Sequence, residues 1–134
     1  GIWSVEREAA RAREYNGDYH IFASDIDPKA VEISRANAKR AGVERLIEFF
    51  VADARGFSRP TERGVIVTNP PYGERLYADF GRALAKAQGW ELYLLSSHTE
   101  LERCLGRSAD RKRRLYNGMI RCELYIYKNG GSRR

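Results

Sequence analysis

Apolar and polar residues follow two spacings along the chain, and the change from one to the other predicts a succession of strands and helices. Short runs rich in β-branched and aromatic residues predict strands at residues 19–24, 46–52, 65–68 and 90–95. Apolar residues at near-helical spacing predict helices at residues 2–15, 28–41, 76–88 and 99–105. This alternation indicates an α/β fold with a mainly parallel sheet and helices on both of its faces.

Local signals define the ends of one of these helices and predict one further element. Asp27 is a good helix N-cap, and Pro28 suits the first helical position. Gly42 is expected to close the same helix in the left-handed conformation. At the end of the chain, residues 112–127 predict an antiparallel hairpin that turns at Asn117-Gly118, a favoured two-residue turn.

The strongest chemical signal is the tetrapeptide Asn69-Pro70-Pro71-Tyr72, which follows the third predicted strand. The Asn69 carboxamide oxygen and the Pro70 carbonyl can accept the two N–H bonds of an amino group on a flat ring. Both bonds together turn the nitrogen lone pair toward an incoming methyl group, and the Tyr72 ring can lie against an unstacked base. The plainer interpretation is that Pro70-Pro71 only ends the strand and starts a loop.

Two other predicted strands end in aspartates that suit a nucleoside. Asp25 can bind both ribose hydroxyls of an adenosyl group, with Ile26 offering an apolar face to the adenine. Asp53 can accept a hydrogen bond from the adenine amino group while the Ala54 N–H donates to a ring nitrogen. The plainer interpretation of each aspartate is a helix cap or a turn residue. Because parallel sheets bind ligands beyond the carboxyl ends of their strands, we expect Asp25, Asp53 and Asn69 to project toward one edge.

Composition limits the classes open to this chain. Its 134 residues are 43% hydrophobic and 31% charged, as in one ordinary globular domain. No apolar run is long enough for a membrane span, and Cys104 and Cys122 are too few for a metal cluster or a disulfide framework. We therefore expect no membrane, no metal and a cytoplasmic location. The net charge of +6 is a weak indication of a polyanionic partner.

Together these motifs resemble the S-adenosyl-L-methionine-dependent methyltransferases with the Rossmann-like class I fold. Within them the chain is similar to the RNA guanine-N2 methylases usually joined to an RNA-binding THUMP domain, including large-subunit ribosomal RNA methylases. Residues 24–28, 52–55, 68–76 and 115–118 match that pattern in order. Asn-Pro-Pro-Tyr alone is shared with DNA adenine and protein glutamine methylases. The extension Gly73-Glu74-Arg75-Leu76 and the later Leu115-Tyr116-Asn117-Gly118 favour the RNA guanine branch.

The resemblance implies S-adenosyl-L-methionine as cofactor and N2-methylguanosine in RNA as product, with ribosomal RNA favoured over transfer RNA. It implies a catalytic segment of Asn69, Pro70, Pro71 and Tyr72. It implies cofactor contacts from Asp25, Ile26, Asp53, Ala54 and Asn69. His20 and His98 are isolated in the sequence and are given no catalytic role.

The chain departs from the family pattern at its start. Family members begin the catalytic domain with a strand and a glycine-rich loop that holds the methionine part of the cofactor, but this sequence contains no Gly-x-Gly. We therefore expect residues 1–129 to be the later part of a catalytic domain and 130–134 to be a loose basic tail. Without the first strand, a slot would separate the strands that end at Asp25 and Asn69. The missing N-terminal half would come from the same or another chain.

The basic run Arg111-Lys112-Arg113-Arg114 precedes the predicted hairpin. It is either a solvated face or a surface that contacts RNA phosphates, and Arg75 is a further candidate for such contacts. Two other functions stay open. A DNA adenine-N6 methyltransferase would use the same Asn-Pro-Pro-Tyr chemistry, and a non-catalytic RNA-binding fragment could keep the methylase shape without the cofactor site.

Overall fold

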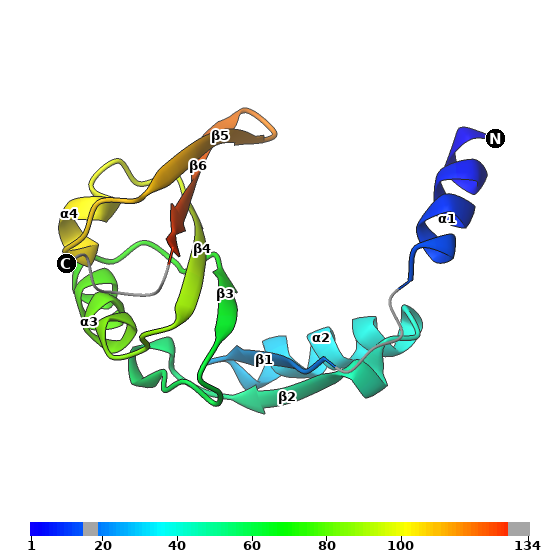
Figure 1. Cartoon of the computed structure of the whole chain (residues 1–134), viewed down its shortest axis with the longest axis horizontal. Helices are drawn as coiled ribbons and strands as arrows, with labels where there is room; N and C mark the ends of the chain where they lie inside the picture. Colours follow the sequence, from blue (N-terminus) through cyan, green and yellow to red (C-terminus); the bar gives the residue numbers. More distant parts are fainter. Residues whose placement is uncertain (15–18, 129–134) are drawn as a thin grey trace. The chain divides into compact units, whose positions relative to one another are not determined.

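The computed structural model describes residues 1–14 and 19–128, and its elements fall into two compact units (Figure 1). Unit 1 is Gly1–Val51 and unit 2 is Ala52–Arg134. Both units combine helices with strands, so the predicted α/β composition is confirmed. The predicted tail, residues 130–134, lies outside the described residues.

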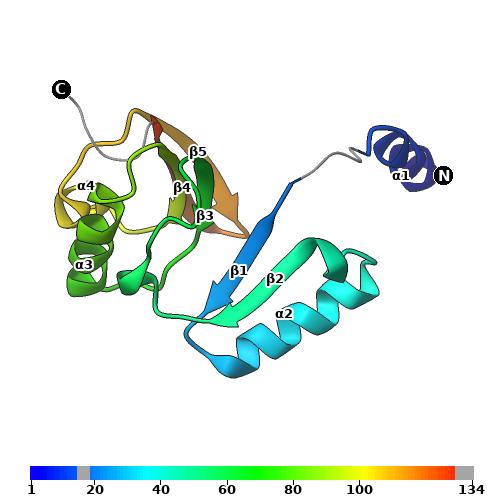
Figure 2. The same cartoon turned by 60° about the horizontal axis from the view of Figure 1, so that its bottom comes forward.

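Unit 1 contains a small parallel sheet. β1 (Ile21–Asp25) pairs with β2 (Ile47–Val51), and the register sets Asp25 opposite Val51. α2 (Pro28–Arg40) and the short helix η1 (Glu44–Leu46) connect the strands, and α2 runs alongside both of them (Figure 2). Both predicted strands are confirmed, with ends shifted by the one or two residues over which boundaries usually vary. Because the strands are parallel, Asp25 stands at the carboxyl edge of this sheet.

The helix α2 begins and ends as the sequence predicts. The Asp27 carboxylate accepts a hydrogen bond from the Lys29 N–H at 2.9 Å, and Pro28 is the first helical residue. Gly42 has a φ of 74°, and its N–H donates to the Lys39 carbonyl at 3.0 Å. Only glycine adopts this φ without a steric penalty, so both ends of the helix are specified locally.

The helix α1 (Ile2–Ala12) is shorter than the helix predicted at residues 2–15, and Tyr15 lies outside the described residues. None of its residues is buried, although Ile2, Trp3 and Val5 are apolar. Short helices gain most of their stability by packing an apolar face. α1 is therefore less stabilised than α2, which buries Val31 and Ala38.

Unit 2 is built on a four-stranded sheet with the order β3-β4-β6-β5. β3 (Gly64–Thr68) and β4 (Trp90–Ser96) are parallel, whereas β6 (Ile120–Tyr127) is antiparallel to both β4 and β5 (Arg111–Asn117). The described strands thus form a two-stranded parallel sheet and a four-stranded mixed sheet, and the predicted antiparallel hairpin belongs to the second. The parallel pairs and the hairpin agree with the sequence, whereas the pairing of β4 with β6 was not predicted, because it joins residues far apart in the chain.

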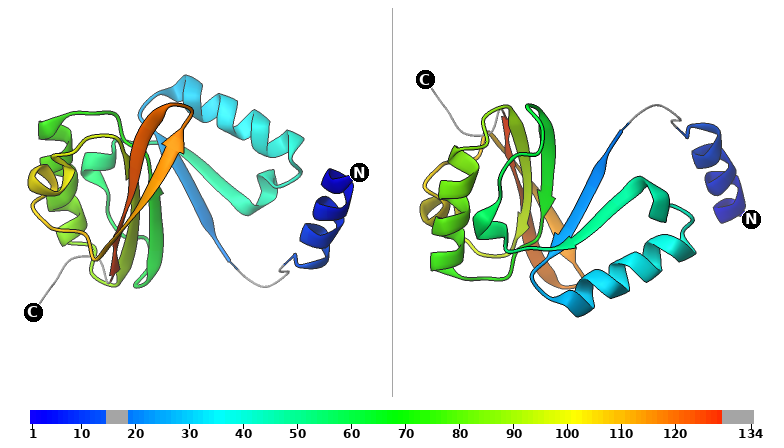
Figure 3. Two further views of the ribbon diagram at one scale, coloured as in Figure 1. Left: turned by 90° about the horizontal axis from the view of Figure 1, so that it is seen from above. Right: turned by 90° about the horizontal axis from the view of Figure 1, so that it is seen from below.

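Two helices, α3 (Glu74–Ala85) and α4 (Leu101–Leu105), lie on the same side of this sheet (Figure 3). α3 begins two residues before the predicted start, because the Tyr77 N–H already bonds to the Gly73 carbonyl at 2.9 Å. α4 begins two residues after its predicted start, with Glu100 as its N-cap. The core between helices and sheet contains Tyr77, Phe80, Leu84, Leu92, Leu94, Leu101, Leu105, Tyr125 and Tyr127.

The C-terminal hairpin forms as predicted but turns one residue later. Asn117 pairs with Ile120, which leaves Gly118 and Met119 as the two loop residues. Gly118 has a φ of 61°, which the first position of such a turn requires. Asn117 is therefore the last residue of β5, because glycine is the residue that enters the left-handed region most easily.

Gly81 allows α3 to approach the end of α4. A Cβ at this position would overlap the Leu105 carbonyl oxygen and lie 3.1 Å from its carbonyl carbon. Although alanine favours helices, we expect Gly81→Ala to lower the free energy of unfolding by about 1–3 kcal/mol, the usual cost of overpacking. Urea denaturation measures this. Gly56→Ala is the matched control, because nothing lies within 4 Å of a Cβ there; equal losses in both variants would contradict the close contact.

Candidate functional site

The tetrapeptide Asn69-Pro70-Pro71-Tyr72 leaves the carboxyl end of β3 and leads into α3. Asn69, Pro71 and Tyr72 are exposed, and Pro70 is half-buried. Within residues 1–14 and 19–128, the Asn69 carboxamide takes part in no hydrogen bond. Its oxygen is therefore available to accept one from a ligand, as predicted for an amino group on a flat ring.

Tyr72 is the exposed member of a cluster of three rings, Tyr72, His98 and Tyr77, that extends into the core of unit 2. The residue is 63% exposed, and its ring meets the His98 ring edge-on, with 4.1 Å between centroids and an interplanar angle of 65°. The buried Tyr77 ring lies 6.2 Å from Tyr72 and 6.0 Å from His98. Edge-on pairs such as Tyr72–Tyr77 are favourable at centroid separations of about 4.5–7 Å, and the Tyr72–His98 pair is packed more closely. The ring predicted to lie against a base is thus supported by two others.

His98 had no predicted role, and the fold brings it to Tyr72. Its backbone N–H donates to Ser96 Oγ at 3.0 Å, and its backbone carbonyl accepts from the Tyr125 hydroxyl at 3.3 Å. Its Nε2 is buried without a hydrogen-bond partner among the described residues, and such a group costs about 1–3 kcal/mol. No sequence signal reveals this contact, because the two rings lie on separate segments after β3 and β4.

Asp53 is the N-cap of the short helix η2 (Ala54–Gly56). Its carboxylate accepts from the Arg55 N–H at 2.9 Å and from the Arg55 guanidinium, with 2.6 Å between Nη2 and Oδ2. The Arg55 guanidinium lowers the pKa of Asp53, so the ionised form is favoured. Each carboxylate oxygen carries two lone pairs. An adenine amino group would therefore bind beside Arg55 and not at an unpaired carboxylate.

Asp25 is the last residue of β1, and the following Ile26 is 65% exposed. Asp25 Oδ1 accepts from the Asp27 N–H at 2.8 Å, whereas Asp27 caps α2. The predicted cap is thus confirmed at Asp27. The geometry holds the Asp25 carboxylate at the strand end, beside an exposed apolar side chain.

The predicted site residues lie in both units. Asp25 and Ile26 belong to unit 1, whereas Asp53, Ala54 and the tetrapeptide 69–72 belong to unit 2. Asp25 ends a strand of a parallel pair, and Asn69 directly follows a strand of another parallel pair. Each therefore stands at the kind of strand end at which such sheets bind ligands. Their expected meeting at one common edge stays a prediction.

The predicted basic run lies along β5, and every residue of this strand is exposed. Successive side chains of a strand point to opposite faces, so Arg111 and Arg113 share one face while Lys112 and Arg114 share the other. Arg75, in the first turn of α3, is also exposed. Cations are thus presented on both faces of the hairpin.

Lys112 differs from its arginine neighbours because it is bound within unit 2. Its Nζ lies 2.7 Å from Glu102 Oε1 and 6.0 Å from the centre of the Tyr125 ring. This hydrogen bond raises the pKa of Lys112 and lowers the pKa of Glu102. The ion pair between Lys112 and Glu102 therefore links β5 to α4, a contact that no sequence pattern indicated.

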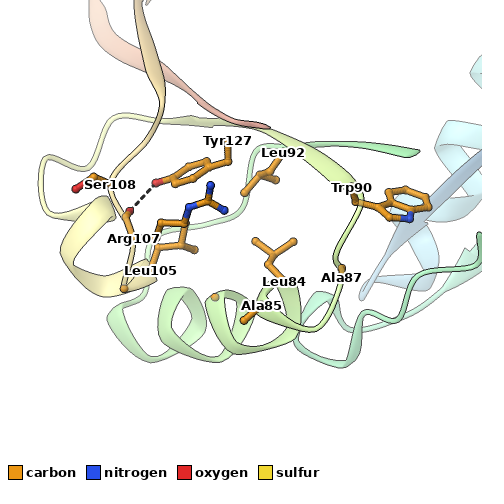
Figure 4. Close-up of a pocket in the computed structure, with 11 residues that line it drawn as sticks. Leu84, Ala85, Ala87, Trp90, Leu92, Leu105, Arg107, Ser108 and Tyr127 are labelled. Atoms are coloured by element: carbon orange, nitrogen blue, oxygen red, sulfur yellow. Dashed lines mark hydrogen bonds between the residues drawn. The ribbon is translucent and has the colours of Figure 1, made fainter. Parts of the chain in front are cut away.

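Unit 2 also has a cavity of about 400 Å³ between α3, β4 and the segment after α4 (Figure 4). Leu84, Leu92 and Leu105 line it. The Arg107 guanidinium lies 5.4 Å from the centre of the Tyr127 ring, and the Tyr127 hydroxyl donates to the Arg107 carbonyl at 3.0 Å. No residue of the tetrapeptide lines this cavity, so it is separate from the candidate site.

Within the described part of the chain, no three His, Cys, Asp or Glu side chains gather as they would around a metal ion. None of its helices combines the length and the apolar character needed to cross a membrane. Cys104 and Cys122 are free thiols.

A family model described as RMKL-like, methyltransferase domain, matches residues 2–126. The chain therefore belongs to the RMKL-like methyltransferase domain family, and the predicted resemblance to methyltransferases is confirmed.

Three relatives illustrate this membership. The chain is 39% identical over 136 residues to YpsC of Bacillus subtilis (strain 168), assigned as an RNA methyltransferase, and the match covers 94% of this chain and 35% of YpsC. It is 38% identical over 140 residues to the ribosomal RNA large subunit methyltransferase K/L of Shewanella baltica (strain OS155), covering 94% of this chain and 20% of that protein. SMU.472, assigned as a methyltransferase and solved in complex with SAH, is 33% identical with a TM-score of 0.82, covering 99% of this chain and 37% of that structure.

The structural likeness confirms the predicted Rossmann-like class I methyltransferase fold. The chain spans well under half the length of each of these relatives.

Proposed function

We propose that this chain is part of an S-adenosyl-L-methionine-dependent RNA methyltransferase that modifies the exocyclic N2 of guanine. The observation that carries the proposal is the tetrapeptide at the end of β3, where the Asn69 carboxamide makes no hydrogen bond to any residue that the structure describes and the exposed Tyr72 ring is supported by His98. Membership of a methyltransferase domain family supports it. So do the relatives whose names describe them as RNA methyltransferases.

The chemistry needed at the base is mainly orientation. The Asn69 oxygen and the Pro70 carbonyl accept the two N–H bonds of the guanine amino group, and Tyr72 stacks on the base. S-adenosyl-L-methionine, when bound, supplies a methyl group already activated as a sulfonium. Holding the reactants in line therefore provides most of the rate enhancement. No strong base is required, because the nitrogen can lose its proton to water during or after the transfer.

The residues for the adenosyl part of the cofactor fit this proposal. The carboxylate of Asp25 would bind the ribose, and Ile26 would lie against adenine, as its exposure allows. Asp53 and the Ala54 N–H would bind the adenine edge, with Arg55 keeping the carboxylate ionised. The methionine part would be held by residues outside this sequence, which has no Gly-x-Gly and is much shorter than its relatives. A cytoplasmic location belongs to the same proposal.

The second candidate is methylation of adenine N6 in DNA, since an adenine amino group meets the same pair of acceptors. RNA guanine is favoured by the Gly73-Glu74-Arg75-Leu76 extension and by the hairpin that carries Leu115-Tyr116-Asn117-Gly118. Ribosomal RNA is favoured over transfer RNA by the named relative from Shewanella baltica.

The arginines of β5 are expected to contact RNA phosphates, whereas Lys112 is expected not to. Removing one phosphate contact reduces the slope of log affinity against log salt by about 0.7 on single strands and 0.9 on duplex. Arg113→Gln should show this loss in fluorescence anisotropy with a labelled ribosomal RNA fragment at several salt concentrations. Lys112→Gln is the matched control, because its ammonium is bound to Glu102. An equal loss of slope in the control would contradict this assignment.

The test of the function is transfer of labelled methyl from S-adenosyl-L-methionine by this chain joined to its native upstream sequence. The substrates are unmodified ribosomal RNA, transfer RNA and DNA. Label on guanine N2 of RNA is the expected result. Label on adenine of DNA would replace the proposal with the second candidate. Bound cofactor without label on any of these substrates would overturn both candidates and favour a protein substrate or a non-catalytic role.

A further inference from the structure

We propose that His98 is a positioning residue for the methyl transfer: it holds the Tyr72 ring in the orientation that stacks on the target base. This role rests on the proposed function, because it concerns the same base-binding segment. His98 would contact neither the base nor the cofactor and would act only through Tyr72.

The first reason is that Tyr72 needs external support. The residue is 63% exposed, and it precedes α3 on the segment between Pro71 and Gly73. An exposed tyrosine ring samples several rotamers, whereas stacking requires one, and fixing a side chain on binding costs entropy. The His98 ring, 4.1 Å away and inclined at 65°, blocks part of that freedom before any base arrives.

The second reason is that the backbone of His98 is anchored on both sides of its ring. Ser96 Oγ accepts from the backbone N–H of His98 at 3.0 Å, and the Tyr125 hydroxyl donates to the His98 backbone carbonyl at 3.3 Å. Ser96 is 6% exposed, and its Oγ lies 3.2 Å from the Tyr77 hydroxyl. These contacts tie the backbone that carries the His98 ring to β4, β6 and α3.

The third reason concerns which part of the histidine is used. Its Nε2 is buried and has no hydrogen-bond partner among the described residues. The contact with Tyr72 is one between flat rings. A phenylalanine at position 98 would keep a flat ring and remove the unpartnered nitrogen, so it should fold at least as well. This substitution separates the ring contact from the imidazole chemistry.

The kinetic experiment uses the full-length protein that contains this chain, with labelled methyl transfer to its RNA. His98→Ala should lower kcat about 3- to 10-fold, the size expected for one aromatic contact, with unchanged affinity for S-adenosylhomocysteine. His98→Phe should stay within about 2-fold of the parent, since the aromatic contact is kept. His20→Ala is the matched control, because that histidine lies in unit 1 with its side chain 66% exposed. His98→Ala at the parent rate, or His98→Phe as slow as His98→Ala, would overturn the role.

A double-mutant cycle distinguishes positioning from a general structural effect. In a Tyr72→Ala background, His98→Ala should cause no further loss, because the ring that it holds is gone. Independent, multiplying losses would overturn the role of His98. If Tyr72→Ala itself methylates at the parent rate, the base-stacking part of the proposed function fails instead, so the two failures are distinguishable.

A second readout needs no substrate. In proton NMR spectra of this 134-residue chain, Tyr72→Ala should shift the ring resonances of His98, since the two rings lie within the range of ring-current effects. Tyr116→Ala is the control, because Tyr116 is exposed on β5. Unshifted His98 resonances in the Tyr72 variant would show that the rings are not in contact and would overturn the proposal.

Discussion

Replacing Asn69 by alanine is expected to lower the rate of methyl transfer by about 100-fold or more, the usual cost of losing one preorganised polar contact. The carboxamide is exposed and makes no hydrogen bond within the described residues, so its removal disturbs no internal contact. Affinity for S-adenosylhomocysteine, measured by calorimetry, should stay near that of the parent protein. The loss should therefore fall on kcat.

Two further variants make this result specific. Asn69→Asp keeps an oxygen acceptor and should retain more of the rate than Asn69→Ala. Asn37→Ala, at an exposed position of α2, is the matched control for loss of a carboxamide. An Asn69→Ala protein that methylates at the parent rate would show that the tetrapeptide only ends the strand.

Asp25→Ala is expected to have the opposite profile, with cofactor binding lost first. A hydrogen bond to a charged group contributes roughly 1.5–3 kcal/mol, which corresponds to about a 10- to 150-fold weaker affinity for S-adenosylhomocysteine. Asp25→Asn keeps the shape of the side chain and its acceptor for the Asp27 N–H. It should show a smaller loss.

The matched control is the neighbouring Asp27→Ala. Asp27 caps α2 by accepting from the Lys29 N–H, so its removal should cost about 1 kcal/mol of stability and leave cofactor affinity unchanged. If the two variants weaken cofactor binding equally, Asp25 would be only a structural residue of the turn.

The parts of the fold that could be predicted are those specified by nearby residues. The ends of α2 follow from Asp27, Pro28 and Gly42, each of which acts within a few residues of itself. The hairpin was also predictable, although its turn moved to Gly118-Met119. The antiparallel pairing of β4 with β6 was not, because it joins residues that no local pattern links.

The candidate site likewise combines residues that the sequence identifies with contacts that only the fold creates. The tetrapeptide and the two aspartates were found because each follows a strand that can be predicted. The contact between Tyr72 and His98 was missed, as was the ion pair between Lys112 and Glu102, because the fold alone brings these residues together. The bond between Asp53 and Arg55 spans only two residues. It was within reach of sequence reasoning, since aspartates at turns commonly bind the backbone two residues on.

The two edges of the sheet in unit 2 differ in charge. β5 carries a row of cations, whereas β3 is uncharged, with Val65 55% and Val67 79% exposed. Charged edge strands resist pairing with other molecules, and uncharged apolar ones invite it. The apolar edge along β3, which ends next to Asn69, is therefore the edge of unit 2 that is open to pairing with a further strand. The first strand that the family pattern includes would fill this edge, so supplying that strand should protect unit 2 from aggregation as well as complete the cofactor site that we propose.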